Sequence, residues 1–174
     1  MFTGDQSGDW LFEALFRYGF ANQPRSTHRG DGLTLIDAVI IAAVRCAPPD
    51  NKPSPMELRN CRVFLRRELE ILSSRRVVVT LGQIAFRSFL LAWSENGRAL
   101  PDRTLRFSHG GEWDLGDGVT LVSSYHPSRQ NTQTGRLTRS MFHRIFRRAR
   151  SLLDSIALAA LASWWLMTAH LAIA

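Results

Sequence analysis

The order of apolar and polar positions along the chain predicts helices that alternate with buried strands. Between Gly8 and Gly19 apolar residues recur at helical spacing, with Ser7 available as the cap and Gly19 as the stop. Residues 33–44 form a nearly continuous apolar run, rich in β-branched side chains, which ends just before two prolines. Such a run is typical of a strand that is buried on both faces.

The remaining segments repeat this alternation. Ser54 and Glu57 flank a proline in the arrangement of a capped helix start. The predicted elements from there on are a helix over 55–72, a strand over 76–81, a helix over 84–93, a strand over 119–124 and a helix beginning near 138. Because strands that alternate with helices are joined by right-handed crossovers, we expect a mostly parallel sheet covered by helices on both faces.

A parallel sheet of this kind also predicts where a site would lie. Ligands bind beyond the carboxyl ends of the strands, where the loops from neighbouring strands meet. Three segments leave the ends of predicted strands, and they read RCAPPDN, LGQ and SYHPSRQN. We therefore look for candidate chemistry in residues 45–51, 81–83 and 124–131.

The last segment, residues 156–174, contains no formally charged side chain. Its length approaches the roughly 20 apolar residues that span a bilayer. The segment is rich in alanine, however, and contains Ser163, Thr168 and His170. A packed C-terminal helix, a weak membrane anchor and a non-native tail all stay open, and the composition favours packing or a non-native tail. We treat residues 154–174 as an apolar tail of unknown role and expect no membrane partner.

Composition bounds the class of protein. The chain has 174 residues, of which 45% are hydrophobic and 21% are charged, which is ordinary for one globular domain. Two cysteines exclude a disulfide-rich secreted scaffold. The N-terminal segment shows no basic stretch followed by an apolar run, so no signal peptide is visible and the cytoplasm is the expected location. The formal net charge of +7 favours an anionic partner such as nucleic acid or a membrane surface.

The positive charge is concentrated in the last third of the chain. All but one of the 22 basic residues are arginines, and the stretch from Arg129 to Arg150 contains seven of them and no acid. A solvated helix face is the ordinary explanation of such a stretch. An acid-free run favours a phosphate-binding surface instead, because soluble helices intersperse charges of both signs and because arginine donates two parallel hydrogen bonds to phosphate.

Two residues suit catalysis, and two cysteines suit a metal centre. Asp5 precedes the first predicted helix, whose N-terminal amides would keep it ionised as a base or as a group that positions water. Capping that helix is the structural alternative. His126 follows a predicted strand and precedes a proline, which fixes its position. Cys46 and Cys61 are too far apart for a typical zinc site, but the proline-rich turn between them can fix one thiolate while the next helix presents the other. Two unrelated buried thiols are the alternative.

Four separated segments together resemble one family. They read MFTGDQSGDWL, AAVRCAPPDNKPSPMELRNC, RVVVTLGQIA and SYHPSRQNTQTGRLT, and they match in order over residues 1 to about 150. The chain resembles family 5, the iron–sulfur type B branch, of the uracil-DNA glycosylase superfamily. The resemblance implies a three-layer α/β/α sandwich around a mostly parallel four-stranded sheet. It also implies a monomeric DNA repair enzyme that flips uracil and other deaminated bases out of double-stranded DNA and hydrolyses their N-glycosidic bond.

The resemblance implies a role for particular residues. Phe2 resembles the aromatic residue that stacks on the flipped base, and Asp5 resembles the acid that positions or activates the attacking water. His126 resembles the histidine that donates to a carbonyl oxygen of the departing base, and Asn51 matches an asparagine of the family's site. The DNA-holding residues that the match implies are Ser128, Arg129, Gln130, Asn131 and Arg136.

The resemblance also implies a [4Fe–4S] cluster held by four cysteines. Cys46 and Cys61 match the third and fourth ligands, so this chain supplies two of the four. The first strand of the family's sheet and the first two cysteines would precede Met1, and we therefore expect an N-terminally truncated glycosylase domain over residues 1–153. The alternative hypothesis is a non-catalytic DNA-binding remnant of such an enzyme. In either case we expect a cytoplasmic protein associated with the nucleoid.

Overall fold

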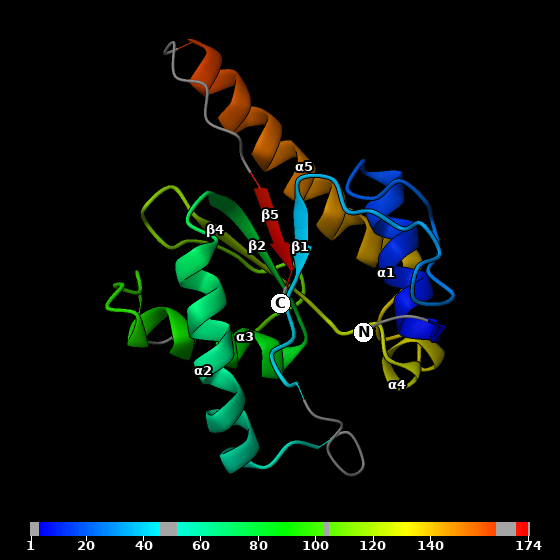
Figure 1. Ribbon diagram of the computed structural model, residues 1–174, viewed down its shortest axis with the longest axis horizontal. Helices are drawn as coiled ribbons and strands as arrows, with labels where there is room; N and C mark the ends of the chain where they lie inside the picture. The colour runs from blue at the N-terminus through cyan, green and yellow to red at the C-terminus, as the bar shows by residue number, and fades with distance from the viewer. Residues whose placement is uncertain (1–3, 46–51, 103–104, 163–169, 174) are drawn as a thin grey trace.

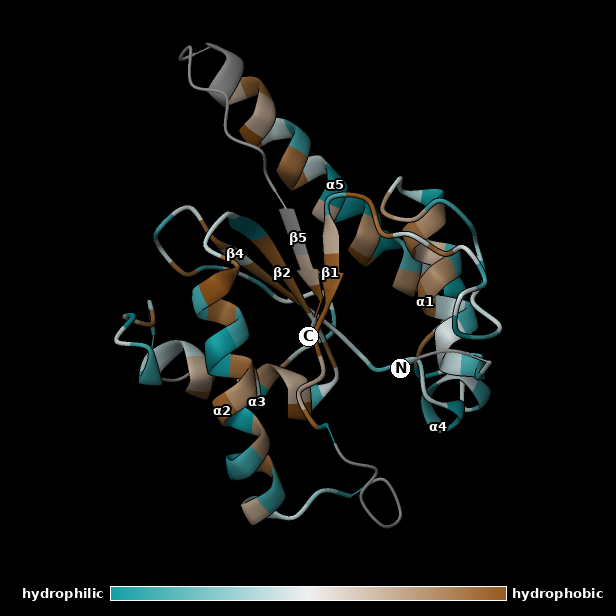
Figure 2. Cartoon of the chain, viewed as in Figure 1, coloured by the Kyte–Doolittle hydropathy of each residue, from teal (hydrophilic) through white to brown (hydrophobic). Residues whose placement is uncertain are grey.

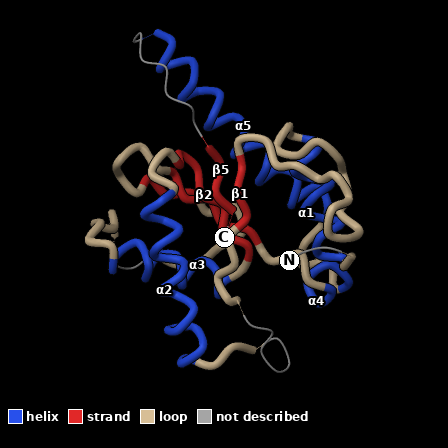
Figure 3. The backbone as a smooth tube through the Cα atoms, viewed as in Figure 1, coloured by secondary structure: helices blue, strands red, loops and turns tan. Residues whose placement is uncertain are grey.

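The computed structural model describes residues 4–45, 52–102, 105–162 and 170–173 (Figure 1). Strands gather in the middle of the molecule and helices lie on either side of them (Figure 3). The elements in chain order are α1 (Gln6–Arg17), β1 (Ala38–Ile40), α2 (Pro55–Ile71), β2 (Arg75–Leu81), α3 (Gln83–Glu95), β3 (Glu112–Asp114), β4 (Thr120–Ser124), α4 (Arg129–Gln133), α5 (Arg139–Ala162) and β5 (His170–Ile173).

The sheet has five strands in the order β1-β5-β2-β4-β3. Four of them are parallel neighbours, and β3 runs antiparallel to β4 at one edge. The mostly parallel α/β sandwich predicted from the sequence is thus confirmed, with five strands in place of four. The sequence did not predict β3, because three residues are too few to show a period, or β5, because alanine-rich segments have low strand propensity.

β5 is an interior strand of the sheet, between β1 and β2 (Figure 1). Its register pairs Ile173 with Ile40 on one side and with Val79 on the other. Ala172 and Ile173 are buried. The apolar tail at 154–174 therefore contributes the last turns of α5 and an interior strand to the part of the fold that the structure describes. Within that part, no helix is long and apolar enough to cross a membrane.

Alternate side chains of the strands fill two separate cores. On β2, Val77, Val79 and Leu81 pack in one cluster with α1 and α5, whereas Val78 packs in the other cluster with α2 and α3. This period of two is what a sheet covered on both faces requires. The central strands are brown and the helix α4 is teal in Figure 2, so the apolar positions lie inside and the loop helix faces water.

The element ends follow from local sequence, with one difference from the prediction. Ser54 and Glu57 form the expected capping box at the start of α2. Of the two caps that the sequence offered for α1, Asp5 occupies the N-cap position and Ser7 does not. The run over 33–44 forms only the short strand β1, because its earlier residues pair instead with the segment after α1, through a bridge from Leu35 and a hydrogen bond from the Ile36 N–H.

Candidate active site

The carboxyl ends of β2 and β4 lie side by side. Leu81 and Ser124 are register partners, and the Gly82 N–H donates to the Ser124 carbonyl oxygen at 2.7 Å. Gly82 has a φ of +94°, and a Cβ at this position would lie 3.2 Å from the Cβ of His126. Only glycine meets both requirements without strain. The LGQ turn thus lets the backbone after β4, and with it His126, approach the end of β2.

His126 is held in a shielded position at this edge. Burial lowers the pKa of its imidazole, and the negative charge of Asp5 opposes that shift by raising the pKa. The net direction is downward from the ordinary value of 6.5, so the neutral ring predominates at pH 7. A neutral imidazole carries one N–H, which can donate a hydrogen bond to an acceptor on a bound molecule.

Asp5 lies on the other side of the site, at the start of α1. Its backbone is extended, and its Oδ1 accepts a hydrogen bond from the Gly8 N–H at 2.6 Å, so it caps the helix. The residue is nevertheless exposed to solvent, and its negative charge raises the pKa of His126. The capping role and the catalytic role were posed as alternatives, but one carboxylate has two oxygens and the geometry accommodates both.

Two hydrogen bonds fasten the start of α1 to the loop after β4. The Ser7 hydroxyl donates to the Pro127 carbonyl oxygen at 3.1 Å, and the Gln6 Nε2 donates to the Thr132 hydroxyl at 3.3 Å. These contacts join residues more than 100 positions apart in the sequence. They explain why Asp5 and His126, which the sequence places at opposite ends of the chain, lie within electrostatic reach of each other.

The loop after His126 is braced from within. The Asn131 side-chain amide donates to the His126 carbonyl oxygen at 2.9 Å, and the Leu137 N–H donates to the Asn131 carbonyl oxygen at 2.9 Å. Ser128 is the N-cap of α4, and its carbonyl oxygen accepts from Thr132. Arg129 and Gln130 are exposed on this short helix. Asn131 therefore holds the loop in shape, and the side chains of Arg129 and Gln130 face solvent.

Arg136 and His109 flank Tyr125, the residue just before His126. The Arg136 guanidinium lies 4.5 Å from the centre of the Tyr125 ring, and the His109 ring stacks on Tyr125 at 5.1 Å. The sequence analysis missed His109. It lies among turn-forming residues in SHGG, where no period or spacing distinguishes a functional histidine from a loop histidine.

The acid-free arginine stretch is partly neutralised in space. Arg139 pairs with Glu13, and Arg148 makes two 2.8 Å bonds to Glu112. Arg150 donates to the carbonyl oxygens of Tyr18 and Gly19, both at 3.0 Å. These three arginines tie α5 to α1, to β3 and to the turn after α1. Their acidic and carbonyl partners come from distant segments, which a count along the sequence cannot show.

With this geometry described, comparison with known proteins identifies the family. The profile of the uracil DNA glycosylase superfamily matches residues 1–150. The chain belongs to the uracil-DNA glycosylase superfamily.

Within the superfamily the chain is similar to enzymes of the fifth type. It is 46% identical to the Type-5 uracil-DNA glycosylase of Thermus thermophilus over 151 residues, which are 87% of this chain and 66% of that protein. It is 45% identical to the Type-5 uracil-DNA glycosylase of Mycobacterium bovis over 153 residues, 87% of this chain and 56% of that protein. The Type-4 uracil-DNA glycosylase of Thermotoga maritima is 31% identical over 101 residues, 58% of this chain and 48% of that protein. The chain thus spans between about half and two thirds of the length of these relatives.

Three residues that the superfamily resemblance singled out, Phe2, Cys46 and Asn51, lie outside the described residues. Cys61 is described and buried on α2, and its Sγ accepts a hydrogen bond from the Arg45 N–H at 3.4 Å. No group of three or more His, Cys, Asp or Glu suited to a metal occurs in the part of the chain that the structure describes.

A four-cysteine iron–sulfur cluster does not fit the residues present. The 174 residues contain two cysteines, and each iron of a [4Fe–4S] cluster takes its own thiolate. Of the predicted site residues that the structure describes, Asp5, His126 and the loop that follows lie at one end of the sheet.

Proposed function

We propose that this chain hydrolyses the N-glycosidic bond of uracil and other deaminated bases in double-stranded DNA. The observation that carries the proposal is the attachment of the start of α1 to the loop after β4, which brings the Asp5 charge within electrostatic reach of His126. Membership of the superfamily supports it. The proposal includes action as a monomer and a cytoplasmic location with the DNA.

A base inside a duplex is inaccessible to these two side chains. The target nucleotide must therefore leave the stack, at a cost of a few kcal/mol. Phe2 is proposed to stack on the extruded base, and Asn51 to contact it, as the corresponding family residues do. Ser128, Arg129 and Gln130, on the loop that Asn131 braces, would hold the flanking backbone, because phosphate contacts fix the register of a duplex without reading its sequence.

The reaction breaks the bond between C1′ of the sugar and the ring nitrogen of the base. The bonding electron pair leaves with the base, so positive charge develops on the sugar and negative charge on the base. Asp5 would stabilise the positive charge and orient the water whose oxygen forms the new bond to C1′. The water's proton passes to the Asp5 carboxylate and then to solvent.

His126 would act on the leaving base. Its neutral ring donates an N–H hydrogen bond to a carbonyl oxygen of the base, where the negative charge accumulates. Because the ring is shielded from water, this hydrogen bond is stronger than the same bond in solvent. The anionic base then takes a proton from solvent, and the products are the free base and an abasic site.

The test is release of uracil from a duplex oligonucleotide under single-turnover conditions. We expect release by the unaltered chain, and a loss of about a hundredfold or more in the Asp5→Asn and His126→Ala variants. Asp9→Asn changes an exposed carboxylate in the first turn of the same helix, and His28→Ala changes an exposed loop histidine. Both controls should retain activity, and equal rates in all four variants would remove the proposed roles.

The same experiment separates catalysis from the DNA-binding remnant. A remnant would bind duplex DNA with strong salt dependence and release no base. Binding without release by the unaltered chain would therefore overturn the proposed function and favour the remnant. The electrostatic interaction of Asp5 with His126 favours the enzyme, because phosphate binding alone gives no reason to place a carboxylate within reach of a shielded histidine.

A further inference from the structure

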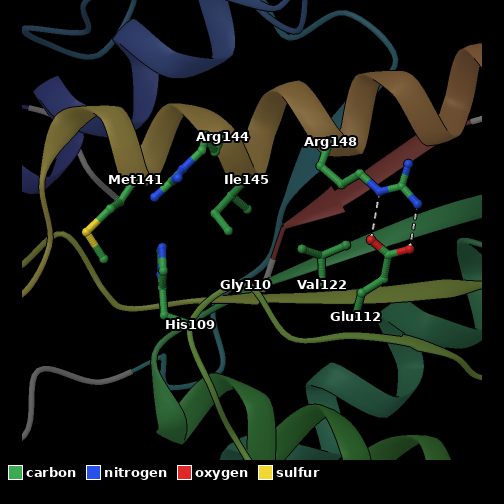
Figure 4. A pocket seen from close by; sticks show the side chains of 8 residues that line it. All are labelled: His109, Gly110, Glu112, Val122, Met141, Arg144, Ile145 and Arg148. Carbon is green, nitrogen blue, oxygen red and sulfur yellow. Dashed lines mark hydrogen bonds and ion pairs between the residues drawn. The ribbon is translucent and has the colours of Figure 1, made fainter.

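A cavity of about 320 Å³ lies under α5, against the edge of the sheet formed by β3 and β4. Figure 4 shows its lining, with Met141, Arg144 and Ile145 descending from α5 and His109 rising from the segment before β3. Glu112 and Arg148 occupy the far end. The candidate active site lies beside this cavity and does not include it.

The hydrogen-bonding state of His109 is fixed by the backbone. The Tyr125 N–H donates to the His109 Nδ1 at 3.2 Å, so this nitrogen acts as the acceptor. In the neutral ring the proton is therefore on Nε2. Burial, together with the charge of Arg144, lowers the pKa of His109, which keeps the ring neutral at pH 7. His109 thus presents an N–H donor to the cavity.

Arg144 presents a second donor to the same space. Figure 4 shows the guanidinium of Arg144 and the ring nitrogen of His109 pointing toward each other. Among the described residues, no oxygen atom accepts a hydrogen bond from the Arg144 guanidinium or from the His109 Nε2. The acid in the lining, Glu112, pairs with Arg148, which donates two hydrogen bonds of 2.8 Å to its carboxylate. Two donors that converge without an acceptor define a place for an anionic oxygen.

We propose that the His109–Arg144 end of the cavity is a subsite for a phosphoryl oxygen of the DNA backbone. The inference rests on the proposed function for its source of phosphate. Arginine and a neutral N–H donor together suit a phosphodiester, whose oxygens carry the charge and accept at short range.

The position of the cavity favours a DNA phosphate over a free anion. His109 stacks on Tyr125, which directly precedes His126, and Arg136 lies over the same Tyr125 ring. A strand held by Arg129 and Arg136 would therefore pass close to the mouth of the cavity. The contact would carry no sequence information, and its effect would be to fix the register of the strand whose base is extruded.

The test is the salt dependence of binding to a uracil-free duplex. Loss of one phosphate contact lowers the slope of log Kobs against log salt by about 0.9. We expect Arg144→Gln to reduce the slope by about that amount and the affinity at low salt by about tenfold. Arg147→Gln removes the same charge from an exposed position on the same helix that does not line the cavity, and its effect should be clearly smaller.

Two substitutions at His109 separate its two nitrogens. In His109→Asn the side-chain oxygen can replace Nδ1 as acceptor for the Tyr125 N–H, and the donor at Nε2 is lost. In His109→Gln the amide nitrogen can reach the Nε2 position and restore the donor. We expect the asparagine variant to bind DNA about tenfold more weakly and the glutamine variant to recover part of that loss. Equal binding by both variants and the unaltered chain would overturn the subsite.

A third experiment distinguishes binding of a DNA phosphate from binding of free inorganic phosphate. The His109 ring resonances are followed by NMR while inorganic phosphate or the duplex is added. Shifts with the duplex at salt concentrations where inorganic phosphate has no effect support the proposal, whereas saturation by inorganic phosphate alone overturns a DNA subsite. Failure of uracil release with the Arg144 slope change intact would reject the proposed glycosylase activity and leave the subsite standing.

Discussion

Both faces of the sheet are covered by helices around a buried core, but the two faces carry different groups. On one face α1 and α5 enclose Phe142, Phe146 and Leu15, and on the other α2 and α3 enclose Phe89 and Trp93. The first face also holds the polar contacts that join the start of α1 to the loop after β4. On the second face, α2 exposes large apolar side chains to solvent, at Met56, Val63, Phe64 and Ile71.

The sheet therefore has a buried core on both faces but the candidate site on one face alone. Alternate side chains of β2 contribute to both cores, so both faces depend on the same central strand. The candidate site forms on the α1 and α5 face because there a helix N-terminus meets the end of a central strand. We therefore expect substitutions that lower activity alone to lie on the α1 and α5 face, and substitutions that lower stability to lie in the cores of both faces.

The largest expected effect is on stability, from emptying either core. Phe146 and Phe89 are both fully buried, on opposite faces. Replacing either with alanine should lower the free energy of unfolding by about 3–5 kcal/mol. Phe64→Ala, on the exposed side of α2, should cost less than about 1 kcal/mol. Denaturant titrations measure all three, and a small loss for Phe89→Ala would contradict the view that the two faces are equivalent cores.

The next effect concerns the joint between the strand ends. Gly82→Ala places a side chain at positive φ and within 3.2 Å of the His126 Cβ, so it should lower stability by about 1–3 kcal/mol and displace His126. Gly97 has a φ of +75° and open space around it, so Gly97→Ala isolates the backbone strain alone. Uracil release should fall in Gly82→Ala and persist in Gly97→Ala. Equal activity in both variants would show that the approach of the two strand ends is not needed.

A smaller effect compares the two helix caps. Asp5 caps α1 and Ser54 caps α2, each through a hydrogen bond to a backbone N–H of the first turn. Replacing either with alanine should cost about 1 kcal/mol of stability. Uracil release should be lost in Asp5→Ala and unchanged in Ser54→Ala, because of the two caps only Asp5 acts electrostatically on His126. Thermal melts and release assays on both variants give the comparison, and loss of release in both would make Asp5 a structural residue.

The smallest effect is a change in a single pKa. The Asp5 charge raises the pKa of His126 against the larger lowering by burial. Asp5→Asn should therefore lower the pKa of His126 further. An NMR titration of the ring protons measures this shift, with Asp9→Asn as the control. An unchanged or raised pKa would show that the two side chains do not interact.

The pKa direction also predicts how stability depends on pH. His126 is held neutral in the folded chain, and in the unfolded chain it takes up a proton near its ordinary pKa of 6.5. The folded state is therefore destabilised as the pH falls below that value, and the loss ends once the folded ring is protonated too. Melting temperatures recorded across this range should fall with pH, and less so in His126→Ala.

The elements that the sequence predicted well are those with a local cause. α2 begins at a capping box, β2 contains an uninterrupted run of three valines, and β4 follows the turn residues before Val119. Asp5 and His126 were singled out by their positions at a helix start and a strand end, together with the family resemblance. Their proximity was not a local property, because it depends on the bonds from Gln6 and Ser7 to the distant loop.

The features that could not be predicted have causes elsewhere in the chain. β5 pairs with β1 on one side and with β2 on the other, and its four residues, HLAI, lie in an alanine-rich tail that does not by itself specify a strand. His109 became a candidate only when the structure placed Arg144 and Tyr125 beside it. Both features depend on contacts between residues that are far apart in the sequence.

The central claim is that Asp5 and His126 act on opposite ends of one bond in the same step. Single-turnover uracil release by the unaltered chain, Asp5→Asn, His126→Ala and the double variant tests it most directly. The account predicts that each single change costs about a hundredfold or more, and that the double change costs clearly less than the product of the two. Losses that multiply independently, or a single variant that keeps full activity, would contradict it.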